Sequence, residues 1–390
     1  MIDMARKCVV VAVASGLTTL GFALAGCTGD DTPAGVLPDA SRSDTASPTG
    51  DAAQPPSDAG APAKVLVVHA SPDLPAVRVC FAIGTKSDGS DGVIAPLPPL
   101  PDRVRGSEPF PGISPGAAAV VDDFGVDLSA KVVVPYVILA SAVASDARSD
   151  AGPAPTGCDA LLSGGAGALA STAYLKLAPI AASTFNRGES VLLAATGCLP
   201  QALDPAASSS LCGSSYSAIT GNVSLKVFKL DTKVTATGAQ LGAQFAQLSS
   251  PVQGSLAPMG VTAALSSASA PDGGPPVALA IGAKFGDLAP KTAAVASVGN
   301  VDDATLSLTT VNADGGASLP LATLPLPLIY TLSTGQLGSA ASYFRFGANY
   351  TFVLVGDPAE PAVADGGLVN GRALHVVAMP SDPVVAKYAP

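Results

Sequence analysis

The sequence predicts an all-β protein: two tandem immunoglobulin-like β-sandwich domains that follow a signal peptide and a disordered tether. Short runs rich in Val, Ile, Leu and Tyr recur along the chain, and Gly/Pro turns separate them. The 390 residues include 41 Gly and 35 Pro, a composition that excludes a helical bundle or coiled coil. Several sequence landmarks also occur twice in the same order, which indicates a repeated unit.

Residues 1–26 have the organisation of a secretory signal peptide. Arg6 and Lys7 precede an uncharged stretch, and Leu24-Ala25-Gly26-Cys27 follows directly. This quartet resembles the lipobox of bacterial lipoproteins, in which the signal is removed before a cysteine that then carries the lipid. The resemblance implies lipidation of Cys27 and a membrane partner reached through that lipid. The implied location is the bacterial cell envelope, at the outer membrane or the cell surface. The alternative is an ordinary signal peptide with a chance cysteine.

Residues 27–62 are expected to form a disordered tether after the lipidated cysteine. They consist almost entirely of Asp, Ala, Pro, Ser, Thr and Gly, with too few large apolar residues to build a core. The net charge of the whole chain is −10, which argues against a nucleic-acid partner and against electrostatic docking on anionic lipid. The later uncharged stretches, 234–271 and 315–344, are interrupted by Pro, so we expect no membrane-spanning helix.

The predicted strands are short and continue to the C-terminus. They lie at 64–75, 77–83, 131–140, 190–195, 223–230, 304–310, 350–355 and 373–379. Many short strands with Gly/Pro turns are typical of a sandwich or barrel.

Four repeated landmarks divide the strands into two copies. The segment 110–120 matches 285–295, and the segment from Phe185 to Gly197 matches that from Phe344 to Gly356. A closing strand follows the Phe-to-Gly segment in each copy. At the front of the two copies, 67–72 matches 245–251. We therefore predict sandwich repeat 1 at 63–231 and sandwich repeat 2 at 239–390. Repeat 1 is longer in two places, about 145–167 and 198–213, which are candidate binding loops or simply tolerated insertions.

The segment that opens repeat 1 carries a family resemblance. Val65-Leu-Val-Val-His69-Ala-Ser71-Pro72-Asp73-Leu-Pro75-Ala-Val77 resembles the opening of a domain-of-unknown-function family of secreted and cell-wall bacterial proteins, whose motif reads Val-Arg-Val-Val-His-Ala-Ser-Pro-Asp-Ala-Pro. The resemblance implies an extracytoplasmic β-sandwich module, often in tandem, without an established activity. Repeat 2 has Gln247 where the motif has His, and it lacks the Pro-Asp pair.

Four of the six cysteines remain after Cys8 and Cys27 are set aside. An even number in an exported protein indicates two disulfides, for which three connectivities are possible. Both Cys198 and Cys212 lie in the second insertion, so the sequence favours a bond between them and a second bond between Cys80 and Cys158. A zinc site is disfavoured because the chain has no Cys-x-x-Cys pair and only 2 His.

The one local grouping that resembles a catalytic set is His69, Ser71 and Asp73. A working triad needs the base to meet both the nucleophile and an orienting group, whereas side chains at alternate positions of one strand diverge. The favoured interpretation is structural: Ser71, Pro72 and Asp73 build a turn and His69 packs against it. No sequence motif for a cofactor or a metal ion is present, so none is expected.

These expectations lead to one favoured hypothesis and two alternatives. The favoured hypothesis is a non-enzymatic surface lipoprotein that acts as an adhesion or recognition module for a glycan or protein ligand. The first alternative is a structural envelope protein without a specific ligand. The second is a hydrolase that uses His69.

Overall fold

The computed structural model describes residues 62–100, 112–121, 127–146, 157–165, 168–201, 208–232, 236–255, 260–270, 274–311, 319–334, 339–360 and 370–381. The chain divides into two compact units, Met1–Gln54 and Pro55–Pro390, and every described residue belongs to the second. The predicted signal peptide, the lipidation site Cys27 and the predicted tether as far as residue 61 lie outside the described residues.

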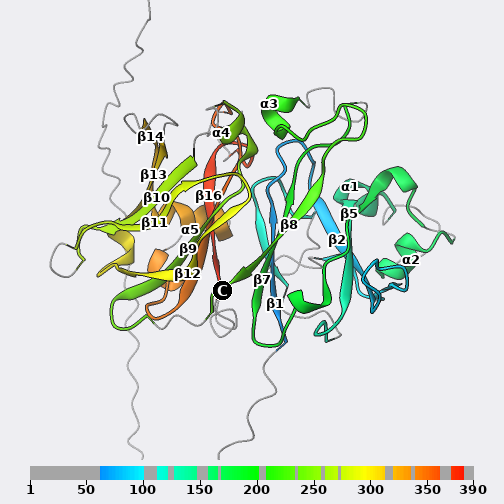
Figure 1. Ribbon diagram of the computed structural model, residues 1–390, viewed down its shortest axis with the longest axis horizontal. Helices are drawn as coiled ribbons and strands as arrows, with labels where there is room; N and C mark the ends of the chain where they lie inside the picture. The colour runs from blue at the N-terminus through cyan, green and yellow to red at the C-terminus, as the bar shows by residue number, and fades with distance from the viewer. Residues whose placement is uncertain are drawn as a thin grey trace, which may run out of the picture. The chain divides into compact units, whose positions relative to one another are not determined.

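The first half of this second unit contains two four-stranded sheets (Figure 1). Sheet A has the order β4-β1-β7-β8, and sheet B has the order β3-β2-β5-β6. In sheet A, β1 runs parallel to β7, and the other neighbours in both sheets are antiparallel. The strands are β1 Lys64–His69, β2 Val77–Gly84, β3 Val93–Ile94, β4 Ala118–Val121, β5 Val132–Leu139, β6 Tyr174–Lys176, β7 Ser190–Thr196 and β8 Ser224–Leu230.

The second half repeats this arrangement strand for strand. Sheet C has the order β12-β9-β15-β16 and sheet D the order β11-β10-β13-β14, so β9 corresponds to β1, β10 to β2, and so on to β16 and β8. As in sheet A, β9 and β15 are parallel. The all-β, tandem-sandwich prediction is therefore confirmed. The strands are β9 Gln240–Gln247, β10 Gly260–Ser267, β11 Val277–Ala283, β12 Asp287–Ser297, β13 Ala304–Val311, β14 Leu319–Pro325, β15 Asn349–Val355 and β16 His375–Pro380.

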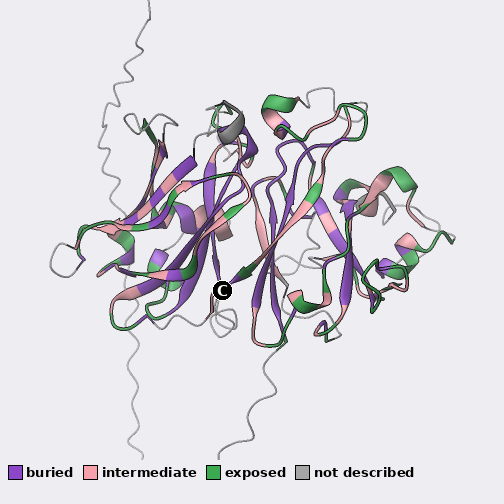
Figure 2. Cartoon of the chain, in the orientation of Figure 1, coloured by how far each residue is buried: buried purple, intermediate pink, exposed green. Residues whose placement is uncertain are grey.

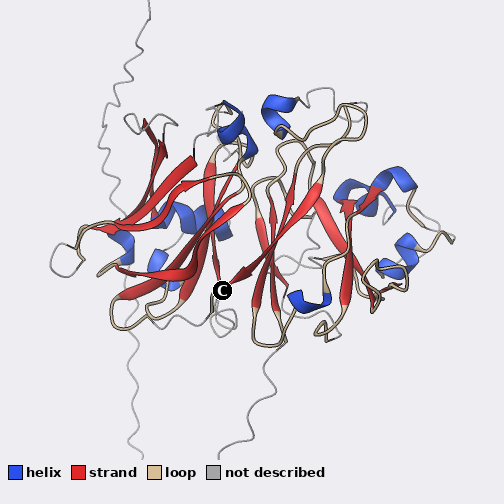
Figure 3. Ribbon diagram, viewed as in Figure 1, coloured by secondary structure: helices blue, strands red, loops and turns tan. Residues whose placement is uncertain are grey.

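The helices are short and subordinate to the strands (Figure 3). They are α1 Ala140–Asp146, α2 Cys158–Leu162, α3 Ser209–Cys212, α4 Ser250–Ser255 and α5 Leu326–Thr334, with 3-10 turns η1 Ser171–Ala173, η2 Ala182–Thr184, η4 Val301–Asp303 and η5 Ala340–Ser342. No helix among the described residues combines the length and apolarity needed to cross a membrane.

Of two repeated landmarks, the structure aligns the glycines after β7 and β15 but not the Ala-Ala-Val segments. Gly197 and Gly356 follow β7 and β15 with φ of 82° and 87°, and a Cβ there would lie 2.3 Å or less from a backbone oxygen. Glycine is thus required at both positions. The Ala-Ala-Val landmarks also lie on corresponding strands, β4 and β12, but they do not align, because the register of β12 shifts between Ala289 and Ala294.

Each pair of sheets encloses its own hydrophobic core, and a third core lies between the two pairs. Along β1, Val65 and Val67 face the core between sheets A and B, whereas Leu66 and Val68 face the other side. That other side packs against sheet C. The third cluster contains Leu66, Val68, Ala70, Leu192, Ala194 and Leu230 from the first half and Ala246, Leu248, Val353, Val355, Val377 and Met379 from the second.

Because of this third core, β1 and β7 of sheet A and β15 and β16 of sheet C are buried on both faces. Every residue of β1, β7, β15 and β16 is buried, as the purple strands in Figure 2 show. This explains why their sequences are continuous apolar runs without polar alternation. The prediction of two sandwiches did not include this contact between their sheets.

Polar contacts also join the two halves. The buried Lys64 ammonium donates to Pro380 O (2.6 Å), and Ser190 Oγ donates to Ser381 O (2.6 Å). His375 Nε2 lies 3.0 Å from Gly116 O. The halves are therefore joined both by apolar packing and by hydrogen bonds that satisfy backbone carbonyl groups at the interface.

Candidate functional site

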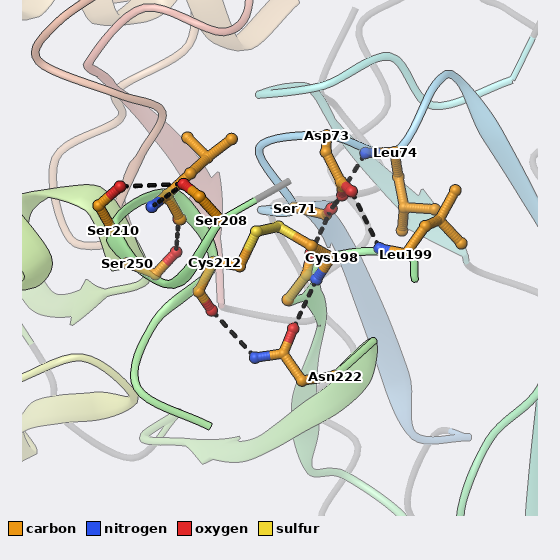
Figure 4. The surroundings of a disulfide bond; sticks show 12 residues. Ser71, Asp73, Leu74, Cys198, Leu199, Ser208, Ser210, Cys212, Asn222 and Ser250 are labelled. Atoms are coloured by element: carbon orange, nitrogen blue, oxygen red, sulfur yellow. Dashed lines mark hydrogen bonds between the residues drawn. A yellow bond between two sulfur atoms is a disulfide. The ribbon is translucent and has the colours of Figure 1, made fainter. Parts of the chain in front are cut away.

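The predicted motif at the end of β1 forms a buried clamp rather than an open site (Figure 4). Ser71 Oγ lies 2.5 Å from Gly197 O and 3.0 Å from Asp73 Oδ1, so its single proton is shared between two acceptors. The Leu74 N–H donates to Ser71 Oγ (3.2 Å), and the Leu199 N–H donates to Asp73 Oδ2 (2.9 Å). These bonds tie the turn between β1 and β2 to the segment that follows β7.

The second half contains the corresponding clamp without the carboxylate. Ser249 Oγ donates to Gly356 O (2.5 Å) and accepts from the Val252 N–H (3.4 Å). Gln247, in the place of His69, bonds to the N–H and C=O of Ser249. The same serine geometry is thus kept where neither the histidine nor the aspartate of the motif is present, which favours a structural role for Ser71.

His69 does not meet the other two motif side chains as a catalytic base would. Its Nε2 lies 2.9 Å from Pro75 O, and its Nδ1 has no hydrogen-bond partner among the described residues. The ring is 1% exposed, and burial lowers the pKa of His69 below its usual value. A buried, neutral ring bonded to a backbone carbonyl is a packed side chain of the turn.

The structure pairs Cys198 with Cys212 and Cys80 with Cys158, which is the pairing that the sequence favoured. The Cys198–Cys212 bond, here called the loop disulfide, lies beside the clamp. Asn222 spans it: the Cys198 N–H donates to Asn222 Oδ1 (2.8 Å), and Asn222 Nδ2 donates to Cys212 O (3.0 Å). The loop disulfide and Asn222 therefore hold Cys198 and Cys212 close together at the two ends of the second insertion.

The described part of this insertion contacts the second half of the molecule. Its helix α3 packs against α4 of the second half, and Ser250 Oγ donates to Leu211 O (2.9 Å). The described part of the candidate binding loop 198–213 thus joins the two halves.

The Cys80–Cys158 bond, here called the sheet disulfide, attaches α2 to the outer face of sheet B. Both sulfurs lie in a small buried cluster with Ile138. Much of the other candidate loop, at 147–156 and 166–167, lies outside the described residues.

The acidic side chains near turns are used for turn formation and ion pairing. The Ser129 N–H donates to Asp127 (2.9 Å), and this bond, followed by the Arg187 guanidinium, lowers the pKa of the Asp127 carboxyl to about 2. Asp302 accepts from Ser339 and Ala340 at the start of η5. In the part of the chain that the structure describes, no three His, Cys, Asp or Glu residues gather as a metal site would require.

An open groove of about 500 Å³ lies between the edges of sheets A and B. One wall is β8 and the residue before it, with Val223, Leu225 and Val227, and the other is the segment after β6, with Leu177 and Ile180. The side chains of Lys176 and Lys229 also line it, and both are exposed. No sequence motif marks this groove, because its two walls come from strands that are distant in the chain.

The corresponding edge in the second half is closed. There α5, which has no counterpart in the first half, packs against β16 and β14 and buries Leu326, Ile329 and Tyr330. The first half has only the short turn η2 between β6 and β7. The groove is thus the most evident difference between two otherwise matching sandwiches.

Comparison with known proteins adds little to this picture. No protein-family model matches the chain, and no curated protein is significantly similar to it. The chain is similar to the crystal structure of a putative cell adhesion protein from Bacteroides eggerthii, with 11% identity, 83% of this chain and 96% of that chain covered, and a TM-score of 0.20. The fold assignment therefore rests on the strand topology alone, and the family resemblance of the His69 motif stays a prediction.

Proposed function

We propose that this protein is a non-enzymatic recognition module of the bacterial cell envelope, of the adhesion type, that binds a ligand in the groove between β6 and β8. The observation that carries the proposal is the open groove, lined by both apolar and polar side chains, whose counterpart in the second half is filled by α5. Exposed apolar surface rimmed by charged side chains is typical of interaction sites.

The anchoring part of the proposal comes from the sequence. The Leu24-Ala25-Gly26-Cys27 quartet predicts a lipid on Cys27, and the acidic segment to residue 62 would hold the sandwiches away from the membrane. We place the protein in the cell envelope, at the outer membrane or the cell surface, on these grounds. Mass spectrometry of the mature N-terminus tests this directly, and an unmodified Cys27 would contradict it.

Binding is favoured over hydrolysis because the motif side chains are committed to the clamp. Ser71 and Asp73 are 2% and 5% exposed, and each bonds to the segment after β7. A nucleophile and its base need access to a substrate, which this burial opposes. The hydrolase hypothesis predicts that His69→Ala abolishes turnover without lowering the free energy of unfolding. We expect His69→Ala to lower the free energy of unfolding without abolishing any turnover.

The test is a binding survey of the mature chain from residue 27, with Cys27→Ser so that it carries no lipid. Glycan arrays and peptide arrays are probed with the disulfide-bonded protein and, as a control, with the reduced and unfolded protein. We expect specific binding by the folded form. If neither array yields a ligand, the recognition proposal fails and a structural envelope role replaces it.

A further inference from the structure

We propose that the outer edge of β8 binds an extended acidic peptide segment of a partner protein as an added strand, with the peptide's apolar side chains in the groove. This inference deepens the proposed function and rests on it. It assigns the ligand class, the binding edge and the mode of recognition.

The hydrogen-bond pattern shows which main-chain groups of β8 are free. The Ala70 N–H donates to Ala195 O, and the Lys64 N–H donates to Glu189 O, so the odd-numbered residues of β7 point toward β1. The even-numbered residues of β7 therefore point toward β8, and Leu192 pairs with Phe228. Consequently, every second residue of β8, namely Leu225, Val227 and Lys229, directs its N–H and C=O away from sheet A.

Nothing in the described part of the chain pairs with these groups. β8 is the last strand of sheet A, and no hydrogen bond is found to the outward N–H or C=O of Leu225, Val227 or Lys229 among the described residues. Such a free edge is a template for another strand.

In the second half, the corresponding edge strand, β16, has its outward main-chain groups covered. Ala378 of β16 corresponds to Val227, because it pairs with Phe352 as Val227 pairs with Leu193. Its N–H donates to Ser333 Oγ (2.8 Å), and its C=O accepts from Tyr343 OH (2.6 Å). Ser333 belongs to α5, so the helix that fills the groove also satisfies the edge. The first half lacks this helix and keeps both the edge and the groove open.

The side chains along the edge indicate what the added strand looks like. Val223, Leu225 and Val227 are half-buried and point into the groove, so a strand beside them can insert an apolar side chain at every second position. The remaining positions lie on the opposite face of the sheet, where β8 carries Lys226, while the exposed Lys176 and Lys229 line the groove, so basic side chains on both faces favour carboxylates in the added strand. Lys229 already contacts Glu189 at 2.9 Å, so Lys176 carries most of this preference.

The same lysines disfavour a second copy of this chain as the occupant. Two β8 strands placed edge to edge would bring Lys226 and Lys229 of each copy close to those of the other, and like charges across a strand pair are destabilising. A basic edge on a chain of net charge −10 instead selects an acidic partner.

The experiment uses the mature chain with Cys27→Ser and a capped peptide, Glu-Val-Glu-Val-Glu-Val-Glu, as the probe. Two further peptides carry N-methyl groups, one on all Val amides and one on all Glu amides. In a strand, only one of these sets faces β8, so strand addition predicts that one methylated peptide binds at least about tenfold more weakly while the other does not. Which peptide loses affinity tells whether the added strand is antiparallel or parallel.

Amide hydrogen exchange gives a second readout on the protein. With the peptide bound, the amides of Leu225, Val227 and Lys229 should exchange more slowly, whereas those of Lys226 and Phe228, already bonded to β7, should not change. Equal binding of both methylated peptides, or no protection at the outward amides, would overturn the inference.

Two protein variants complete the test. Val227→Pro removes an outward N–H but no bond to β7, and its matched control Val227→Ala keeps the N–H. Should the proline variant not fold, Lys176→Glu serves instead, with Lys86→Glu as an exposed control outside the groove. We expect about threefold to fivefold weaker binding for Lys176→Glu at low salt and no change for Lys86→Glu. If the arrays yield a ligand whose binding none of these changes affects, the β8 assignment fails while recognition stands; if no ligand binds at all, both fail.

Discussion

Removing the clamp serine from each half in turn separates a structural role for the His69 motif from a chemical one. In the first half, Ser71→Ala removes the hydroxyl that bonds to Gly197 O, to the Leu74 N–H and to one oxygen of Asp73. In the second half, Ser249→Ala removes the hydroxyl that bonds to Gly356 O and to the Val252 N–H, and no carboxylate is involved. The two variants therefore remove the same hydroxyl from matching sites that differ by one charged partner.

The expected losses in the free energy of unfolding follow from the number of hydrogen bonds removed and from the charge of their partners. A buried neutral partner contributes about 1 kcal/mol and a bond to a charged group contributes about 1.5–3 kcal/mol. We therefore expect Ser71→Ala, which loses two neutral bonds and one bond to a carboxylate, to lower the free energy of unfolding by about 3.5–5 kcal/mol, and Ser249→Ala, which loses two neutral bonds, by about 2 kcal/mol. The aspartate accounts for the difference.

The assay is chemical unfolding followed by circular dichroism, because the chain has no Trp to report by fluorescence. Guanidinium midpoints of the two variants and the parent are compared at pH 7.5 with both disulfides intact. Unchanged stability of Ser71→Ala together with the loss of a hydrolytic activity would refute the clamp and support the catalytic reading. A larger loss for Ser249→Ala than for Ser71→Ala would refute the role given to Asp73.

Three further predictions concern titration, the disulfides and the interface. Burial lowers the pKa of His69 below 6.5, so as the pH falls the unfolded chain binds a proton at a higher pH than the folded chain does. The contribution of His69 to the free energy of unfolding should therefore be constant above about pH 6.5 and decrease at lower pH. His69→Gln should flatten this dependence in urea titrations at about pH 7.5 and 5.5. From sequence separations of 14 and 78, replacing both cysteines with Ala should cost about 3 kcal/mol for the loop disulfide and about 4.5 kcal/mol for the sheet disulfide, and the reverse order of unfolding midpoints would contradict this. Leu192→Ala and Leu193→Ala should each cost about 2–5 kcal/mol, but only Leu192 lies in the core between the halves, so only its variant should split the calorimetric transition in two.

Some features of the fold followed from local sequence. The runs beginning at Lys64, Ser190 and Tyr350 lie on strands because β-branched and apolar residues are grouped between Gly and Pro turns. The repeat was visible because glycines such as Gly197 and Gly356 occupy backbone positions that other residues do not tolerate. Such positions keep their residue type when neighbouring loops change length.

Several strands had no clear signal in the sequence. β10 and β11 carry small residues such as Ala and Ser, whose strand preference is weak, so their sequences do not predict strands. β3 and β6 are too short for alternation to be visible. These strands are defined mainly by the neighbours with which they pair, and a single sequence does not contain those neighbours' positions.

The sequence by itself determined the all-β class, the tandem sandwiches and the favoured cysteine pairing, since each depends on residues close together in the chain or on their order. The tertiary structure decided that sheets A and C pack face to face, that Ser71 and Asp73 hold the segment after Gly197, and that β8 keeps a free edge beside a groove. These features join residues that lie far apart in sequence. They depend on the hydrogen-bond register and on which face of each strand is covered, and both are set only when the sheets assemble.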